Sequence, residues 1–213
     1  MAQPTLAETV ASMLLEVKAV RLSPDQPFKW ASGWNSPIYC DNRITLSFPK
    51  VRTAIKNGLA SAVQAYWGDV DIIAGVATAG IPQGALVADW LDLPFCYVRP
   101  EPKKHGMGNQ IEGQLKPGQK VVLIEDLIST GGSSLKAVDA LREAGANVLG
   151  MVSIFTYGFE IADKNFAEKN LKVYTLSNYE TLIKEAVAKN YVSESQLITL
   201  QEWRHNPSEW KAN

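Results

Sequence analysis

Two adjacent carboxylates precede a turn that is rich in glycine and hydroxyl side chains. Glu125 and Asp126 follow the apolar run 121–124, and residues 129–134 are Ser-Thr-Gly-Gly-Ser-Ser. Such a turn, placed before a helix, presents backbone N–H groups and hydroxyls to a phosphate, helped by the helix dipole and without any Lys or Arg. The carboxylates favour a different partner, such as a ribose diol or a metal-bound water. A phosphorylated sugar satisfies both halves of the motif.

Other phosphate-binding patterns are missing from the sequence. No Gly-Lys-Ser/Thr occurs for a P-loop, and no G-x-G-x-x-G follows a strand-like segment. The alternative for residues 129–134 is an ordinary strand-to-helix turn with Ser or Thr as its N-cap. Two acids directly before the turn and an apolar strand behind it favour the ligand site. Residues 75–82 also join a strand to a helix, so their amides are a weaker candidate for the same chemistry.

These residues must be positioned by the elements around them. From residue 49 onward, short apolar segments alternate with amphipathic helical ones. This alternation predicts an α/β fold with a doubly wound, mostly parallel sheet that has helices on both faces and binds ligands at the carboxyl ends of its strands. The expected strands are residues 71–75, 95–98, 121–124, 148–155 and 172–176, and the expected helices are residues 49–67, 81–91, 132–144, 159–169, 179–189 and 194–203.

The amino-terminal residues depart from this alternation. Apolar side chains between residues 6 and 20 recur at helical spacing, which predicts an amphipathic helix that ends near residues 23–24. Residues 28–43 mix aromatics with glycine and proline, which favours a hairpin or an extended lobe. We therefore expect a single domain over residues 1–213, in which residues 1–45 form a small N-terminal hood of helix and β-hairpin.

The composition excludes several classes of function. The 213 residues are 46% hydrophobic, and 21 Lys plus Arg against 22 Asp plus Glu give a net charge of −1, so we expect no nucleic-acid or membrane surface. Two cysteines and two histidines provide neither a disulfide framework nor zinc-ligand spacing. The longest uncharged apolar stretch, residues 148–159, is shorter than the ~20 residues of a membrane span. We expect a soluble, cytoplasmic protein.

Three motifs together resemble one enzyme family. The strand, acid pair and glycine turn resemble the phosphoribosyl pyrophosphate (PRPP) signature of the type I phosphoribosyltransferases. Residues 32–39, Ser-Gly-Trp-Asn-Ser-Pro-Ile-Tyr, resemble the amino-terminal segment of the orotate phosphoribosyltransferases. Residues 99–106, Arg-Pro-Glu-Pro-Lys-Lys-His-Gly, resemble the mobile loop of the same enzymes. The resemblance spans most of the chain and implies the type I phosphoribosyltransferase fold.

The resemblance implies a role for each matching residue. In that family the acid pair approaches the ribose hydroxyls, the turn holds the 5-phosphate, and the hydroxyl at the position of Ser129 also contacts orotate. The residues implied in catalysis are Lys103, His105 and Asp126. The residues implied in PRPP binding are Arg99, Lys103, Lys104, His105, Glu125, Asp126, Leu127, Ile128, Ser129, Thr130, Gly131, Gly132 and Ser133.

The implied reaction transfers the phosphoribosyl group from PRPP to orotate and releases pyrophosphate, as in pyrimidine synthesis. Departing pyrophosphate develops negative charge, which the cations of the loop 99–118 and Mg²⁺ would stabilise. The Mg²⁺ would be held mainly by PRPP and water, so no protein metal ligands are expected. In these enzymes the loop reaches the neighbouring subunit's site, which implies a homodimer.

Two alternatives remain open at this point. One is a phosphoribosyltransferase for a purine or for uracil, against which residues 32–39 are the main argument. The other is a non-catalytic regulator that binds PRPP, although such a protein should carry a DNA-binding module and a basic patch. Cations that many orotate enzymes carry are also replaced here. Lys29 and Arg43 are therefore alternative cations for the orotate carboxylate, with a purely surface role equally open.

Overall fold

The computed structural model describes residues 3–30, 33–101 and 110–211. The chain divides into two compact units. The larger unit contains residues 53–176, and the smaller unit combines residues 1–52 with residues 177–213. The expectation of a single domain with a hood over residues 1–45 stays a prediction. Among the described residues, no helix is both long enough and apolar enough to cross a membrane.

The larger unit is built on a six-stranded sheet with the strand order β10-β9-β8-β5-β6-β7. The pairs β5–β6, β5–β8 and β8–β9 are parallel, and the short edge strand β7 is antiparallel to β6. β7 was not expected from the sequence, because two residues carry too little pattern to be recognised. The strands are β5 (Ile72–Val76), β6 (Phe95–Val98), β7 (Ile111–Glu112), β8 (Lys120–Ile128), β9 (Asn147–Thr156) and β10 (Val173–Asn178).

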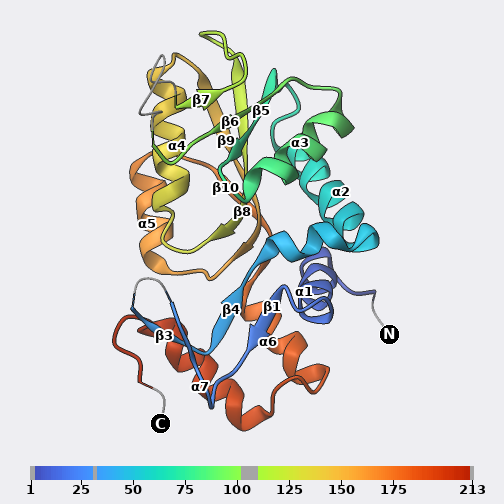
Figure 1. Ribbon diagram of the computed structural model, residues 1–213, viewed down its shortest axis with the longest axis vertical. Helices are drawn as coiled ribbons and strands as arrows, with labels where there is room; N and C mark the ends of the chain where they lie inside the picture. The colour runs from blue at the N-terminus through green and yellow to red at the C-terminus, as the bar shows by residue number, and fades with distance from the viewer. Residues whose placement is uncertain (1–2, 31–32, 102–109, 212–213) are drawn as a thin grey trace. The chain divides into compact units, whose positions relative to one another are not determined.

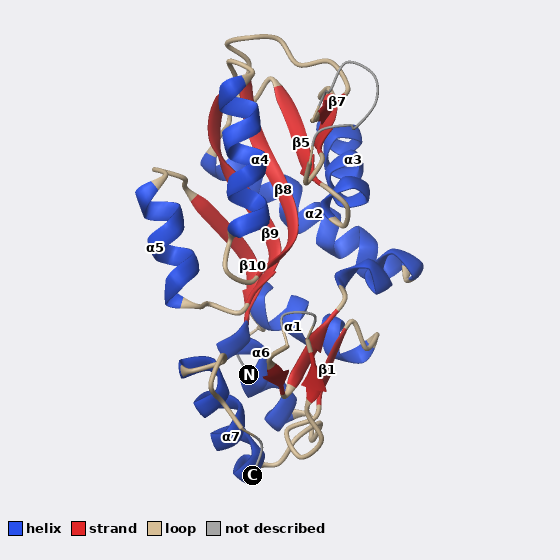
Figure 2. Cartoon of the chain, turned by 60° about the vertical axis from the view of Figure 1, so that its left-hand side comes forward, coloured by secondary structure: helices blue, strands red, loops and turns tan. Residues whose placement is uncertain are grey.

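Helices cover both faces of this sheet, as Figures 1 and 2 show. Helices α4 (Gly132–Glu143) and α5 (Glu160–Glu168) lie on one face, and α2 (Pro49–Tyr66) and α3 (Gly80–Leu91) lie on the other. The predicted α/β fold with a mostly parallel sheet is therefore confirmed. The core beneath α4 and α5 includes Ile72, Val121, Leu123, Val138, Leu141, Met151 and Phe166.

β8 lies in the interior of the sheet and is longer than predicted. Its first half pairs with both β5 and β9, and its second half continues along β9 until Ile128 meets Thr156. We expected the strand to end at Ile124, because acidic residues are uncommon in buried strands. Pairing with β9 overrides that preference, so Glu125 and Asp126 lie within the strand rather than after it.

The smaller unit begins with helix α1, which ends earlier than the apolar spacing indicates. α1 covers Leu6–Glu16, and Lys18 follows in the left-handed region at φ 58°. The chain then forms β1 (Val20–Leu22), which pairs antiparallel with β4 (Ile38–Cys40). The expected continuation of the helix to residues 23–24 was wrong, since apolar residues 20 and 22 satisfy the period of a strand as well as that of a helix.

The expected hairpin in residues 28–43 is present as β2 (Phe28–Lys29) paired with β3 (Asn35–Ser36). A 3₁₀ helix, η1 (Asn42–Ser47), follows β4 and was not expected. The unit is completed by α6 (Tyr179–Ala188) and α7 (Glu194–His205) from the other end of the chain.

Side chains of α6 and α7 anchor these two helices within the smaller unit. Trp203 is fully buried, donates a hydrogen bond from Nε1 to the carbonyl oxygen of Asn35 (3.2 Å), and meets the ring of Trp30 edge-on. The hydroxyl of Tyr179 donates to the carbonyl oxygen of Leu200 at 3.0 Å. The amino-terminal strands and the carboxyl-terminal helices therefore share one core.

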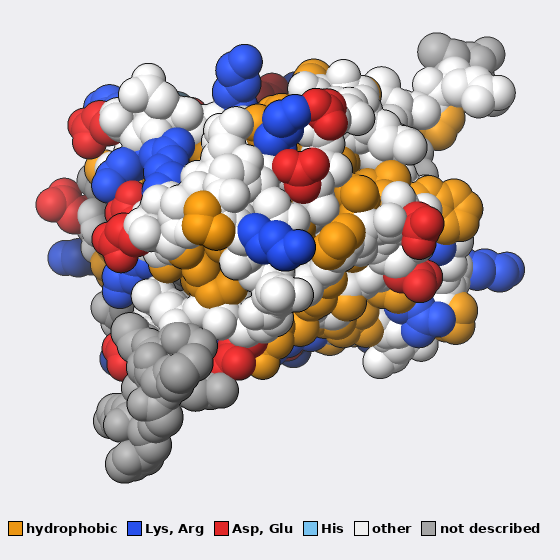
Figure 3. Space-filling view, turned by 90° about the horizontal axis from the view of Figure 1, so that it is seen from above, with side chains coloured by type: hydrophobic (Ala, Val, Ile, Leu, Met, Phe, Trp, Pro, Cys, Tyr) orange, Lys and Arg blue, Asp and Glu red, His pale blue; other side chains and the backbone are white. Residues whose placement is uncertain are grey.

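The surface agrees with the balanced charge of the sequence. On the face shown in Figure 3, Lys and Arg side chains are interspersed with Asp and Glu, and apolar side chains lie among them. A face of this kind offers no extended basic field to a polyanion.

Candidate functional site

The turn between β8 and α4 is fixed by contacts with α5. Gly131 has φ +79°, a conformation that favours glycine, and a Cβ at this position would lie 2.7 Å from the Phe166 ring. The side-chain amide of Asn165 donates to the carbonyl oxygen of Thr130 at 3.1 Å. No sequence motif points to Asn165 or Phe166, because each acts on the turn from another helix.

The first turn of α4 is open to an anion. Gly131 is its N-cap, and within the described part of the chain no side chain caps the helix and no acidic residue stands in its first turn. Gly132 and Ser133 are exposed, so their N–H groups and the positive end of the helix dipole face outward. The structure thus brings residues 129–133 together in the geometry that the sequence predicted for a phosphate turn. Phosphate binding itself stays a prediction.

Glu125 lies beneath this turn. Its side chain is 5% exposed, its Oε2 accepts a hydrogen bond from the Ser134 hydroxyl at 2.9 Å, and its Oε1 accepts one from the Asp126 N–H at 3.1 Å. Burial, reinforced by the negative charge of Asp126, raises the pKa of Glu125 well above its ordinary value. Ser134 belongs to the quoted motif, but nothing in the sequence distinguished it from the other hydroxyls of the turn.

Asp126 has a different environment. It is half-buried whereas Glu125 is buried, and the two side chains lie close enough for the charge of Asp126 and a side-chain hydrogen bond with it to raise the pKa of Glu125. Of the next two residues, Leu127 is half-buried and Ile128 is buried in the core. The two acids that the sequence predicts to act together are therefore not equivalent.

A second helix begins beside β8 at the same edge of the sheet. The N-cap residue of α3, Ala79, makes no side-chain hydrogen bond, and the Ala77–Thr78 peptide bond before it is cis. A Cβ on Gly80 would lie 2.5 Å from the carbonyl oxygen of Ile124. The amino termini of α3 and α4 therefore lie at the carboxyl ends of neighbouring strands, where open parallel sheets bind ligands.

The basic segment is described only at its two ends. Lys103, Lys104 and His105 lie outside the described residues. Arg99 and Gln110 exchange two hydrogen bonds, from the Arg99 N–H to the Gln110 carbonyl (2.9 Å) and from Gln110 Nε2 to the Arg99 carbonyl (3.0 Å). Arg99 also pairs with Glu112 on β7. An antiparallel strand pair thus forms the base of the predicted loop.

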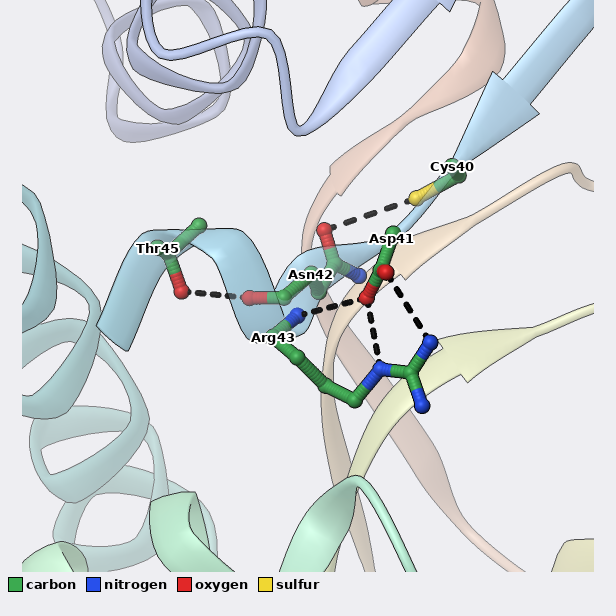
Figure 4. A network of polar contacts seen from close by, with 5 residues as sticks. All are labelled: Cys40, Asp41, Asn42, Arg43 and Thr45. Atoms are coloured by element: carbon green, nitrogen blue, oxygen red, sulfur yellow. Dashed lines mark hydrogen bonds and ion pairs between the residues drawn. The ribbon is translucent and has the colours of Figure 1, made fainter. Parts of the chain in front are cut away.

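The predicted orotate segment lies in the smaller unit, and part of it, Ala31 and Ser32, is outside the described residues. Figure 4 shows that the Arg43 guanidinium binds both carboxylate oxygens of Asp41, at 2.7 and 2.9 Å. These hydrogen bonds and the nearby charge lower the pKa of Asp41. The Arg43 guanidinium is thus already paired with a carboxylate of the chain. Its contact with the orotate carboxylate stays a prediction.

Arg21 makes a contact with two aromatic rings that no sequence motif predicts. Its guanidinium lies 5.5 Å from the ring centroid of Phe28 and 5.1 Å from that of Tyr39, within the range of a cation–π interaction. The Tyr39 ring contacts this cation and also the Phe28 ring, whose centroid lies 5.7 Å away. No motif signals such a contact, because Arg21 is far from Tyr39 along the chain and adjacent only through the pairing of β1 with β4.

The described residues contain no group of three or more His, Cys, Asp or Glu that could hold a metal ion. Carboxylate oxygens suit Mg²⁺, which usually keeps several waters and binds through one or two carboxylates together with substrate phosphates. The described residues therefore agree with a Mg²⁺ that would be held mainly by the substrate and water.

The chain belongs to the phosphoribosyltransferase family, since the model of the phosphoribosyl transferase domain matches residues 46–189. Its relatives include the orotate phosphoribosyltransferase of Cytophaga hutchinsonii, which is 62% identical over 95% of this chain and 97% of that protein. The orotate phosphoribosyltransferase of Listeria innocua is 59% identical over 97% of this chain and 99% of that protein. The resemblance inferred from three short motifs is therefore confirmed.

The fold comparison agrees with the sequence comparison. The crystal structure of orotate phosphoribosyltransferase from Aeropyrum pernix superposes with a TM-score of 0.75 at 28% identity, covering 86% of this chain and 99% of that chain. The expectation of a type I phosphoribosyltransferase fold is confirmed as well. The residue roles that the resemblance implies stay predictions.

Proposed function

We propose that this chain transfers the phosphoribosyl group from PRPP to orotate, forming orotidine 5'-monophosphate and pyrophosphate in the synthesis of pyrimidine nucleotides. Relatives of that name align with nearly the whole chain. The single observation that carries the proposal in the structure is the uncapped first turn of α4, which follows two carboxylates in the last four residues of β8. The N–H groups at the start of α4 suit a phosphate, and the carboxylates a few residues earlier suit the hydroxyls of its sugar.

The 5-phosphate is assigned to the turn after β8. The backbone of Leu127 and Ile128 leads into it, and the N–H groups and hydroxyls of residues 129–133 surround the phosphate oxygens. Donors held by a rigid turn need no reorganisation when the anion arrives, so few cations are required. This assignment explains how a chain of net charge −1 binds a highly anionic substrate.

The ribose and the base are assigned to neighbouring side chains. Asp126 accepts hydrogen bonds from the ribose hydroxyls and stabilises positive charge as the bond to pyrophosphate lengthens. The Ser129 hydroxyl contacts orotate. The pyrimidine nitrogen displaces pyrophosphate at the anomeric carbon through an oxocarbenium-like transition state, so the chain needs no nucleophilic side chain of its own.

The pyrophosphate is assigned to the cations of residues 99–118 and to the amides before α3. Arg99, Lys103, Lys104 and His105 bind its oxygens, and Lys103 or His105 donates a proton to it as it leaves. When bound with PRPP, Mg²⁺ neutralises part of the phosphate charge. The loop serves the neighbouring subunit of a homodimer in the cytoplasm.

Turnover of competing bases tests the proposal. Purified protein is incubated with PRPP and Mg²⁺, and orotate, uracil, hypoxanthine and xanthine are offered in parallel while the loss of each base is followed. We expect orotate alone to be consumed rapidly. Preferential consumption of uracil or a purine would assign a different phosphoribosyltransferase activity, and PRPP binding without turnover of any base would identify a regulator.

A further inference from the structure

The carboxyl group of Glu125 is committed to the protein itself. One oxygen accepts the hydroxyl proton of Ser134 and the other accepts the N–H of Asp126, while the side chain is 5% exposed. Ser153 lies opposite Glu125 on β9, and its buried hydroxyl has no hydrogen-bond partner among the described residues. The Glu125 carboxyl thus bonds to Ser134 and to the Asp126 N–H, and not to this neighbouring hydroxyl.

The bond to Ser134 joins two elements across the turn. Glu125 is on β8, and Ser134 is the third residue of α4. Residues 129–131 connect the strand to the helix. The same helical turn carries the N–H groups that face an anion. Any movement of Ser134 therefore moves those N–H groups, and a misplacement of about 1 Å is enough to weaken preorganised binding or catalysis substantially.

We propose that Glu125 is a positioning residue, which holds the first turn of α4 in place through Ser134 and so aims the backbone N–H groups of the phosphate turn, and that the ribose hydroxyls are left to Asp126. This inference rests on the proposed function, because it concerns the same phosphate turn. The Glu125 side chain is 5% exposed, so its carboxyl would have to move out from beneath the turn to reach a sugar.

The choice of variants follows from hydrogen-bond chemistry. In Glu125→Gln, the amide oxygen can accept from the Asp126 N–H, and the amide nitrogen can donate to the Ser134 oxygen, so the link between β8 and α4 survives without a charge. Glu125→Ala and Ser134→Ala each remove that link. Ser153→Ala is the matched control, because it deletes a buried hydroxyl beside Glu125 that makes no hydrogen bond within the described residues.

The experiment compares binding of methyl phosphate, which has no ribose, with binding of ribose 5-phosphate by phosphorus NMR titration. We expect Glu125→Ala, Ser134→Ala and the double variant to weaken binding of both ligands by the same factor of about ten, equivalent to about 1.4 kcal/mol. Glu125→Gln and Ser153→Ala should stay within about twofold of the wild type, a difference below ~0.5 kcal/mol. Equal losses in the single and double variants would show that the two residues form one link.

Three results would overturn the inference. Loss of ribose 5-phosphate binding in Glu125→Gln with normal methyl phosphate binding would assign Glu125 to the sugar. Unchanged methyl phosphate binding in Ser134→Ala would remove the link from the phosphate site, and this arm stands even if Glu125→Ala does not fold. Unchanged amide hydrogen exchange of residues 132–135 in Ser134→Ala would show, without any ligand, that the link does not hold the first turn of α4. Failure of the wild type to bind methyl phosphate would instead reject the proposed phosphate turn.

Discussion

Glu125 and Asp126 are neighbours on one strand, and their different burial gives them different acid–base behaviour. The pKa of Glu125 is raised by burial and by the charge of Asp126, so the folded protein holds a proton on Glu125 at pH values where the unfolded chain has already released it. Above the ordinary pKa of 4.5, the unfolded state therefore binds fewer protons than the folded state, and stability falls as the pH rises.

The variant Glu125→Gln should remove this pH dependence, because its amide does not titrate. We expect the free energy of unfolding of the wild type to fall relative to that of the variant as the pH is raised from about 4.5 towards 8, with the difference smallest at the acid end. Urea unfolding at a series of pH values measures it. Asp126→Asn should reduce the slope, and parallel pH profiles for wild type and Glu125→Gln would contradict the raised pKa.

Gly131 combines a positive φ with a tight contact, and Gly118 separates the two effects. Both have φ near +80°, but a Cβ on Gly131 meets the Phe166 ring whereas one on Gly118 meets nothing within 4 Å. We expect Gly118→Ala to cost about 1–2 kcal/mol of stability for its conformation. Gly131→Ala should cost a further ~1–3 kcal/mol for overpacking. Equal losses in urea unfolding would mean that the Phe166 ring moves aside freely.

At the scale of elements, the contact of α3 with the sheet depends on two glycines. A Cβ on Gly80 would meet the backbone carbonyl of Ile124 at 2.5 Å, whereas one on Gly84 would first meet the edge of the Phe95 ring at 2.8 Å. A ring can rotate more easily than a carbonyl of an interior strand can move. The start of α3, beside the carboxyl end of β8, is therefore the more sensitive of the two positions.

We expect Gly80→Ala to destabilise the protein more than Gly84→Ala, although both replace glycine by a better helix former. The overlap at Gly80 falls on backbone and should cost at least ~1–3 kcal/mol, while the overlap at Gly84 is partly relieved by movement of Phe95. Thermal unfolding compares the two, with PRPP affinity as a second readout. A larger loss for Gly84→Ala would show that the ring is the more rigid neighbour.

The sequence predicts the elements well where their period is unambiguous and poorly where two rules compete. The central strands and helices of the larger unit were predicted within a few residues, because fully apolar strands and amphipathic helices differ in length and period. The end of β8 was not, since pairing with β9 outweighs the polarity of Glu125. β7 and η1 depend on tertiary contacts of very few residues, which leave no periodic signal.

The same limit applies to the candidate site. The phosphate turn could be predicted because its residues are consecutive and its chemistry is local. The link from Glu125 to Ser134, the contact of Gly131 with Phe166 and the contact of Arg21 with Tyr39 could not, because each joins residues from different elements. Motifs identify which residues are present, and packing decides which of them are buried beneath a site rather than lining it.

At the scale of the whole molecule, the proposed homodimer can be tested with complementary defects. If residues 99–118 serve the neighbouring subunit, a dimer of one Lys103→Ala chain and one Asp126→Ala chain has one site with both defects and one intact site. Random reassociation makes half of the dimers mixed, so we expect roughly a quarter of wild-type activity from two nearly inactive variants.

The matched comparison mixes each variant with itself under the same dissociation and reassociation conditions. Orotate consumption in the presence of PRPP and Mg²⁺ is the readout, and size-exclusion chromatography establishes that dimers have re-formed. Activity that stays at the level of the separate variants, despite mixed dimers, would place the loop in its own subunit's site.

The smaller unit is assembled from both ends of the chain, and this arrangement sets an order of events during synthesis. Residues 53–176 emerge from the ribosome as a continuous stretch that contains every strand from β5 to β9, so their sheet can form while translation continues. α1 and the strands β1 to β4 are translated before this stretch, whereas the helices that complete their core are translated after it. The core shared by α1, β1 to β4 and the two helices can therefore be completed only after α6 and α7 have been translated, later than the sheet of residues 53–176.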